Sequence, residues 1–424
     1  MDFCIFGPID KNNYMRPYAW IPSLYFAEAL PYMAVMTLSV IMYTNLGLSN
    51  TELALYTSWL YLPWVIKPLW SPLIDQFRTK RWWILAMEVL VGASLAGVGL
   101  TLPMGMWLRL SLVFFWLMAF SSATHDIAAD GFYILSLTQE EQALYVGIRS
   151  TFYRIGSIFC QGILVMVAGW LELRYHVSLA WSITMLLMGT MMVGLAGWHA
   201  VALPKEVKSE ERRVKNIIFA PFLATLKAFA AKPHIIPALL FMLLFRLPEA
   251  QLAKMAQPFM LRSLEEGGLG LSTSVVGFAY GTLGVIGLLG GGLVGGWVVS
   301  KHGLKRWLWP MVLAISLPDL VYVYLAYAQP STLWIINACV FTEQVGYGFG
   351  FTAYMLFLVY FARGERSTSV FALCTAFQAL GMMLPGMVAG KFADQWGFAH
   401  FFIWVCLCTI VTFLVSAIIR KDLK

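Results

Sequence analysis

Residues 107–137 read WLRLSLVFFWLMAFSSATHDIAADGFYILSL, an apolar run that encloses the polar cluster THDIAADG at 124–131. The run is long enough to cross a bilayer, which takes about 20 residues of helix. An ionised carboxylate at mid-bilayer costs roughly 2.5–3.5 kcal/mol even on lenient scales, so it normally faces a wet cavity or a partner. Asp126 and Asp130 are four residues apart and share one helix face. This stretch predicts a polar, titratable pathway inside a membrane protein.

The composition of the whole chain points to the same class. Of its 424 residues, 60% are hydrophobic and 12% are charged, and the mean hydropathy is +0.73. Soluble domains carry about 25% charged residues, so the composition excludes the soluble classes. We therefore predict an all-α polytopic membrane protein with the lipid bilayer as its surroundings, and we expect no cleavable signal peptide in residues 1–16.

Twelve apolar runs are long enough to cross a bilayer, and one polar gap divides them six and six. The predicted spans are 17–44, 51–74, 82–103, 107–137, 142–170, 178–202, 234–262, 272–300, 306–328, 332–362, 366–390 and 397–420. The predicted domains are the N-terminus at 1–16, a six-helix bundle at 17–202, a linker at 203–233, a second six-helix bundle at 234–420 and a tail at 421–424.

The distribution of basic residues predicts the orientation. Five of the 29 Lys and Arg residues lie in spans, twenty lie on the side of the termini and the linker, and four lie on the opposite side. Cytoplasmic loops carry the excess of Lys and Arg, so we predict that both termini and the linker are cytoplasmic. The same rule accounts for the net charge of +7, and we expect no nucleic-acid partner.

The two halves resemble each other at the ends of their second spans. SPLIDQFRTKR (71–81) and GWVVSKHGLKR (296–306) both end in a Lys-Arg pair, 225 residues apart. We interpret this as a weak internal duplication that gives two pseudo-symmetric bundles. Duplicated bundles of this kind are typical of transporters that rock around a midplane site.

Two motifs carry a family resemblance. KPLWSPLID (67–75) and DIAADG (126–131) resemble the AmpG-type muropeptide permeases and the related acetyl-coenzyme A transporters of the major facilitator superfamily. The resemblance implies twelve core helices, alternating access, and proton-coupled import of a polar solute across a bacterial cytoplasmic (inner) membrane. It implies a monomer that takes a small-molecule substrate, with the proton gradient as driving force and no cofactor. The chain departs from the pattern at Glu28, which places an extra carboxylate in the first span.

Depth along the helices adds further candidates. With a rise of 1.5 Å per residue, Glu28, Asp126, Arg246 and Glu343 each lie about 16–18 Å from a span end, near the bilayer midplane. They fall on the first, fourth, seventh and tenth spans, which line the central cavity in the resembling family. We therefore predict that these four residues share a plane around a cavity. Asp319 in the ninth span has no place in this scheme.

The hairpin of the fourth and fifth spans predicts ion pairs. Its turn lies near Glu140, so Asp126 and Arg154 are at equal depth, and so are Asp130 and Arg149. The two aspartates share a face, whereas the two arginines lie about 140° apart on their helix. One arginine is therefore expected to neutralise an aspartate, which leaves the other for the substrate or for Glu28.

The candidate residues divide into two groups, and we predict no metal site. The substrate-binding and coupling candidates are Glu28, Lys67, Asp126, Asp130, Arg149, Arg154, Arg246, Glu249 and Glu343. The gating candidates are Asp75, Arg78, Lys80 and Arg81. Glu88 is interpreted as a partner of this cytoplasmic latch or as a solvated helix end, and His125 is more typical of a packing residue than of a proton relay.

Several functions stay open at this stage. The leading one is proton symport of a muropeptide or an amino-sugar-containing saccharide, because the deep charges nearly balance. An acyl-coenzyme A or another anionic metabolite is an alternative substrate. A receptor or channel is not excluded. The spacing of His125 and Asp130 matches that of acyltransferases, but both residues lie deep in a span and about 140° apart, so we do not expect an enzyme.

Overall fold

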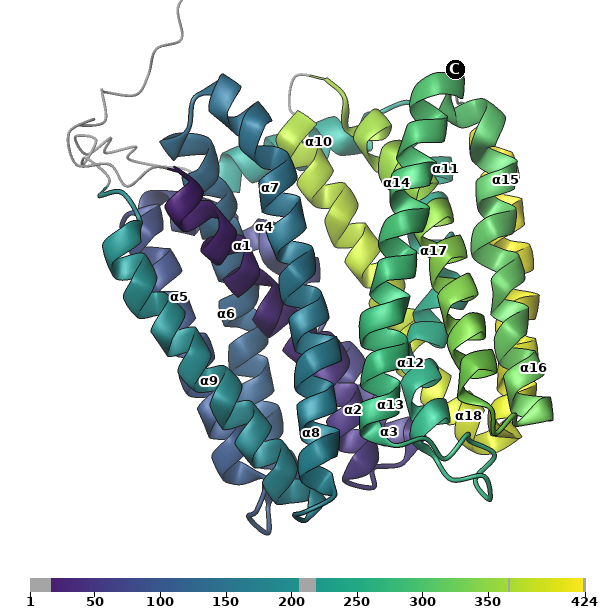
Figure 1. Cartoon of the computed structure of the whole chain (residues 1–424). Coiled ribbons are helices and arrows are strands. Elements are labelled where there is room, and N and C mark those ends of the chain that lie inside the picture. Colours follow the sequence, from purple (N-terminus) through teal and green to yellow (C-terminus); the bar gives the residue numbers. More distant parts are fainter. Residues whose placement is uncertain (1–16, 206–218, 365–366, 422–424) are drawn as a thin grey trace, which may run out of the picture. The chain divides into compact units, whose positions relative to one another are not determined.

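The structure is a computed structural model that describes residues 17–205, 219–364 and 367–421, and every regular element within these ranges is a helix (Figure 1). The elements before the linker are α1 (Pro17–Met33), η2 (Ala34–Leu38), α2 (Ser39–Asn45), α3 (Asn50–Trp59), α4 (Leu62–Gln76), α5 (Lys80–Thr101), α6 (Trp107–Ser136), α7 (Gln139–Ile158), η3 (Phe159–Leu164), α8 (Val165–Glu172) and α9 (Val177–Ala202). The elements after it are α10 (Phe219–Ala230), α11 (Ile235–Leu244), α12 (Leu247–Leu261), α13 (Thr273–Val276), η4 (Gly277–Gly284), α14 (Val285–His302), α15 (Leu304–Ser316), η5 (Leu317–Asp319), α16 (Leu320–Ala328), α17 (Leu333–Ala362) and α18 (Ser367–Arg420).

The helices account for all twelve predicted spans. Ten helices of the described chain are long and apolar enough to cross a membrane. One of them, α18, contains two helices that meet at Gly397, whose φ of 73° and ψ of 160° break the helix there. The predicted span 51–74 is formed by α3 and α4 with a turn at Leu60 and Tyr61. The prediction of an all-helical membrane fold is confirmed.

Contacts divide the chain into two compact units. Of the described residues, the first unit contains 17–35, 67–157, 181–205 and 219–223. The second contains 36–66, 158–180, 224–364 and 367–421. This division groups parts of the first, second and fifth spans with the C-terminal helices, whereas the predicted bundles follow the order of the spans. The arrangement of six plus six helices stays a prediction.

Three spans contain π-helical turns that the sequence does not announce. These turns are η2, η3 and η4. In the second unit, η3 packs against η4 so closely that a Cβ atom at Gly281 would lie 1.9 Å from the carbonyl oxygen of Gln161. Only glycine, which has no Cβ atom, allows this approach. Small residues therefore set the distance between the spans that contain η3 and η4, as they do in GxxxG motifs.

The linker also differs from its prediction as a purely polar gap. Helix α10 occupies part of the predicted segment 203–233, with the sequence FAPFLATLKAFA. The residues of α10 are mostly apolar and can pack against other helices, whereas the sequence KEVKSEERRVKN (205–216) is mostly charged. Most of that charged run, residues 206–218, lies outside the described residues, as do 1–16 and 422–424.

Candidate functional site

The charged cluster of the first unit is built from helices α1, α4, α6 and α7. Lys67 of α4 forms an ion pair with Asp126 of α6. One turn further along α6, Asp130 forms an ion pair with Arg149 on α7, with its Oδ1 atom 2.6 Å from Nη2 of the arginine. We call Glu28, Lys67, Asp126, Asp130 and Arg149 the charged cluster. Each of its two ion pairs joins α6 to a different helix.

Aromatic rings of α1 and α6 hold the Arg149 guanidinium. Its central carbon lies 4.5 Å from the ring centre of Tyr25 and 5.3 Å from that of Tyr133. The Tyr25 hydroxyl donates a hydrogen bond of 3.4 Å to the same oxygen of Asp130 that Arg149 contacts. A cation over a ring face is attracted by the ring quadrupole, so the two tyrosines stabilise the guanidinium beside Asp130.

Glu28 is a third carboxyl group in this cluster. It is 7% exposed, and its Oε2 atom has no hydrogen-bond partner among the described residues. Oxygen atoms of Glu28, Asp126 and Asp130 lie within 4.8 Å of one another. Lys67 and Arg149 pair with Asp126 and Asp130, so Glu28 is the carboxyl group of the three that has no ion pair among the described residues.

Three oxygen ligands at this spacing could also hold a metal ion. Two of the three carboxylates, however, are already neutralised by Lys67 and Arg149. A divalent cation would have to displace both or lie beside two fixed positive charges, which Coulomb repulsion disfavours. The charge inventory therefore fits a proton better than a metal.

The hairpin prediction that one of the two arginines neutralises an aspartate is confirmed. Arg149 contacts Asp130 as the equal depths predict. Asp126 pairs with Lys67 instead of Arg154. Arg154 is exposed and forms no ion pair within the described ranges. The rotation of about 140° between the two arginines explains this, because only one of them can face the aspartates.

The second unit has its own buried ion pair. Arg246 donates to both carboxylate oxygens of Glu249, one turn away, at 2.7 and 2.6 Å. The same guanidinium donates to the Tyr347 hydroxyl at 2.7 Å and lies 4.7 Å from the ring centre of Phe351. Bidentate Arg–carboxylate geometry of this kind fixes both side chains. The pair needs no other helix to form.

Two further carboxyl groups are buried in the second unit. Glu343 of α17 accepts a hydrogen bond of 2.9 Å from Gln344. Asp319, for which the sequence offers no account, is buried in η5 and lies within electrostatic range of Glu343 and Glu249. The prediction that Glu28, Asp126, Arg246 and Glu343 share one plane joins residues of both units and stays a prediction.

The gating candidates are only partly described. Lys80 is buried against Gly131 of α6, and Arg78 is exposed with its guanidinium carbon 5.8 Å from the Trp82 ring centre. Arg81 donates hydrogen bonds to the carbonyl oxygens of Leu203, at 3.2 Å, and Ala200. The side chain of Asp75 lies outside the described residues, so the latch stays a prediction.

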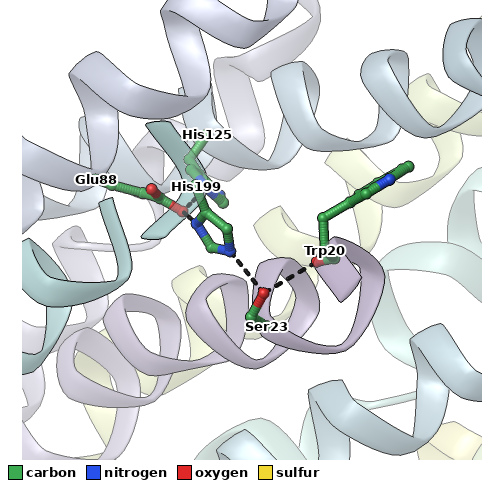
Figure 2. A network of polar contacts seen from close by, with 5 residues as sticks. All are labelled: Trp20, Ser23, Glu88, His125 and His199. Carbon is green, nitrogen blue, oxygen red and sulfur yellow. Dashed lines mark hydrogen bonds and ion pairs between the residues drawn. The ribbon is translucent and has the colours of Figure 1, made fainter. Parts of the chain in front are cut away.

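Glu88 contacts histidines and not the basic residues of the predicted latch. Its Oε1 atom lies 2.7 Å from Nδ1 of His199 and 3.3 Å from Nε2 of His125, and Figure 2 shows the three side chains together. It is also fully buried, so it is not a solvated helix end. No sequence pattern indicated His199, which lies in an apolar span without a polar neighbour.

Polar contacts at the ends of helices in the second unit were also missed. The Asn45 amide donates to Glu172 at 2.8 Å and to the Thr273 hydroxyl at 2.7 Å, which joins the ends of α2 and α8 to the start of α13. Nearby, the Thr51 hydroxyl donates to Asp394 at 2.6 Å. These polar residues lie at or near helix ends, beside the turns between spans, where sequence alone favours solvent exposure.

Comparisons with known proteins place this geometry in a family of transporters. The model of the Major Facilitator Superfamily matches residues 23–386. The anhydromuropeptide permease of Escherichia coli (strain K12) is 26% identical over 367 residues, which cover 85% of this chain and 71% of the relative. The putative transporter AmpG 4 of Rickettsia felis is 24% identical over 393 residues, which cover 89% of this chain and 90% of the relative.

Solved structures share the fold at lower identity. The nucleoside transporter NupG superposes with a TM-score of 0.71 at 14% identity, covering 97% of this chain and 100% of that one. A D-xylose–proton symporter superposes with a TM-score of 0.67 at 11% identity, covering 94% and 95%. The resemblance to the AmpG-type permeases is confirmed, and because these relatives are permeases and transporters the acyltransferase alternative is set aside.

Proposed function

The chain belongs to the Major Facilitator Superfamily, and we propose that it imports a muropeptide or a related amino-sugar saccharide by proton symport. It is a multi-pass membrane transporter. The proposed location is the cytoplasmic membrane of a bacterium, with both termini in the cytoplasm, because the basic residues gather on that side. The proton gradient is the proposed driving force, without a cofactor.

The observation that carries the proposal is the charge inventory of the charged cluster. Three carboxyl groups share two cations, and oxygen atoms of Glu28, Asp126 and Asp130 lie within 4.8 Å of one another. A proton on Glu28 makes the cluster neutral. Its loss would leave a net negative charge on a nearly buried group, which is costly in a low dielectric. The affinity of Glu28 for its proton therefore depends on whether Lys67 and Arg149 stay paired.

This dependence is what coupling requires. If α4 or α7 moves relative to α6, an ion pair opens and its cation becomes available to Glu28. A nearby cation favours the ionised carboxyl group, so the proton leaves in that conformation. Return of the cation to its aspartate makes Glu28 bind a proton again. Binding and release in different conformations converts a proton gradient into solute movement.

The substrate class is supported by the chemistry of the cluster and by one relative. Tyr25 and Tyr133 offer ring faces beside Arg149, a combination that suits a sugar attached to an anionic group. The Escherichia coli relative is an anhydromuropeptide permease. An acyl-coenzyme A, with several negative charges, would need an excess of cations, whereas carboxylates outnumber the paired cations in this cluster.

Closure on the far side is part of the proposal. The contacts of Asn45, Glu172 and Thr273 lie at the end of the span that starts at Pro17, opposite to the termini. We name these three residues the outer gate. In alternating access such contacts would hold the periplasmic side closed while the solute leaves toward the cytoplasm.

Uptake into proteoliposomes tests the proposed function. A panel of labelled anhydro-muropeptides, amino-sugar disaccharides and acetyl-coenzyme A is offered with and without an imposed pH gradient. We expect accumulation of a sugar-containing solute only with the gradient. Accumulation of acetyl-coenzyme A, or accumulation that ignores the pH gradient, would contradict the proposal.

The variant Glu28→Gln separates coupling from binding, because Gln mimics the protonated acid. We expect Glu28→Gln to lose accumulation against the gradient and to keep solute exchange, which needs no net proton movement. Glu140→Gln, an exposed residue at the start of α7, is the matched control and should behave as wild type. Accumulation by Glu28→Gln with wild-type pH dependence would exclude Glu28 as the proton carrier.

A further inference from the structure

Three titratable side chains form a sealed group apart from the charged cluster. Glu88 of α5 and His199 of α9 are 0% exposed, and His125 of α6 is 2% exposed. Figure 2 shows Glu88 between the two imidazoles, with His199 reaching Ser23 of α1. Buried ionisable groups are expensive, and this group takes no part in the ion pairs described above.

The Ser23 hydroxyl lies between two partners, the carbonyl oxygen of Trp20 at 3.2 Å and Nε2 of His199 at 2.9 Å. When its single hydrogen is donated to Trp20, the contact with His199 is donated by the imidazole. The contact of 2.7 Å between Nδ1 of His199 and Glu88 holds one more proton, which the two groups share.

Rotation of the Ser23 hydroxyl allows His199 to lose a proton while the hydrogen bonds among Ser23, His199 and Glu88 are kept. If it turns from Trp20 to Nε2 of His199, it becomes the donor and the imidazole becomes the acceptor. His199 can thus exist with one proton fewer while every heavy atom stays in place. Ser23 is half-buried, whereas the three titratable groups are sealed, so Ser23 is the more open end of the network.

The three titratable groups lie at decreasing depth from the middle of the span toward one membrane face, and Ser23 lies somewhat deeper than its neighbour His199. Counted from the helix ends on that face, His125 is about 16 Å deep, Glu88 about 12 Å, Ser23 about 9 Å and His199 about 5 Å. The hydrogen bonds from Arg81 to Leu203 and Ala200 place the start of α5 beside the end of α9, so both ends lie on the same face.

The inner end of the group adjoins the charged cluster. His125 directly precedes Asp126 on α6, so the two side chains leave one helix toward different neighbours. The Nδ1 atom of His125 has no hydrogen-bond partner among the described residues. In this conformation the group is thus separated from Asp126 at that nitrogen, which prevents a proton leak.

We propose that His125, Glu88 and His199 form a proton relay between the charged cluster and the membrane face at which α1 and α5 begin. The inference rests on the proposed function, because it gives the proton of Glu28 a route to that face. A proton arrives at Nδ1 of His125, and the hydrogen on Nε2 passes to Glu88. The proton shared by Glu88 and His199 moves onto His199, and the hydrogen on its Nε2 passes to Ser23, which releases its own. One proton enters and one leaves.

The electrostatic surroundings of the relay come from four helices. The charged and titratable side chains on these helices near the relay are Tyr25 and Glu28 of α1, Lys67 of α4, Lys80 and Arg81 of α5, and Asp126 and Asp130 of α6. Arg81 lies at the outer end, beside the carbonyl groups that end α9. A fixed positive charge there disfavours a standing proton at the exit and so favours its release.

The test follows protonation of Glu28 directly and needs no solute. Purified full-length protein in liposomes is given a rapid pH step, and the infrared carboxyl band that disappears in Glu28→Gln is recorded over time. In His199→Gln, Glu88→Gln and His125→Gln we expect the band to appear roughly tenfold more slowly or worse, as for loss of a proton-transfer group. His400→Gln is the control, because His400 is exposed and its ring contacts the carbonyl oxygen of Trp396, away from the relay.

The outcomes separate a relay from a structural role. Ser23→Ala and Glu88→Asp are the gentler variants if the others fail to fold, and we expect slower protonation in both. Equal rates in folded relay variants and in wild type would overturn the relay, even if the thermal midpoint falls. This result does not depend on the solute, so the relay can fail while uptake remains proton-driven. Conversely, if no solute of the panel accumulates, the proposed function is refuted. The protonation rates of Glu28 then still test the relay, because they are measured without a solute.

Discussion

The two units form their buried ion pairs in different ways, between helices in the first unit and within one helical turn in the second. In the first unit, Asp126 and Asp130 take their cations from α4 and α7, so each pair joins two helices. In the second unit, Arg246 and Glu249 lie one turn apart around the start of one helix. A pair between helices breaks when the helices move, whereas a pair within one turn survives.

The difference assigns different tasks to the two groups of charges. Pairs that depend on helix positions make proton affinity depend on conformation, which suits coupling. A pair that is preformed presents a fixed pattern of donors and acceptors, which suits recognition of a polar solute without reorganisation. On this basis, substitutions in the first unit should uncouple transport, and those in the second should weaken binding.

The largest expected effect comes from Lys67→Met. It leaves three carboxyl groups with only Arg149, and removal of one partner from a buried pair is far more damaging than removal of both. We expect gradient-driven uptake to fall on the order of 100-fold. Initial uptake rates in proteoliposomes, at matched protein content, measure this.

The double variant Lys67→Met/Asp126→Asn sharpens the result. It restores the charge balance, so we expect the thermal midpoint to recover while coupling stays lost. If Lys67→Met alone keeps uptake within about twofold of wild type, the pair between α4 and α6 is not part of coupling, and the contrast between the units fails.

A smaller effect is expected from Glu249→Gln in the second unit. The change removes the charge that orients Arg246, and hydrogen bonds to charged groups contribute about 1.5–3 kcal/mol, so we expect KM to rise roughly tenfold. Exchange and accumulation should decline together, because coupling is intact. Arg246→Lys is the companion variant and should have the same effect. Loss of accumulation with normal exchange would place Glu249 among the coupling residues instead.

The fold could be predicted because a bilayer requires an apolar run for each span, and because basic residues in the loops indicate the cytoplasmic side. Every predicted span is occupied by helix, including the turn at Gly397 that joins the last two. The π-turns η3 and η4 and the helix α10 could not be predicted. They depend on how closely neighbouring helices pack, and a hydropathy pattern contains no such information.

The site was predictable where local geometry decides it. Depth arithmetic across one short turn found the pair of Asp130 and Arg149. It could not find the pair of Asp126 and Lys67, or that of Glu88 and His199, because these helices are not consecutive along the chain. Which faces of such helices meet is set by tertiary packing. His199 was missed for the same reason.

The smallest expected effect concerns the outer gate, which tests whether a contact can bias conformation without touching the charges of either site. Asn45→Ala removes two hydrogen bonds, of 2.8 and 2.7 Å, between helices of the second unit. Each is worth about 1 kcal/mol net, so the closed population should fall several-fold while uptake changes only about two- to threefold.

Opening of the outer gate is measured by labelling of Leu48→Cys with a membrane-impermeant thiol reagent, above the background of the native cysteines. Ser49→Ala is the matched control, because its hydroxyl only caps α3 at Glu52 and joins no second helix. Faster labelling in Asn45→Ala but not in Ser49→Ala is expected, since only contacts between helices shift the equilibrium between conformations. Equal labelling in both would mean that these hydrogen bonds do not hold the gate.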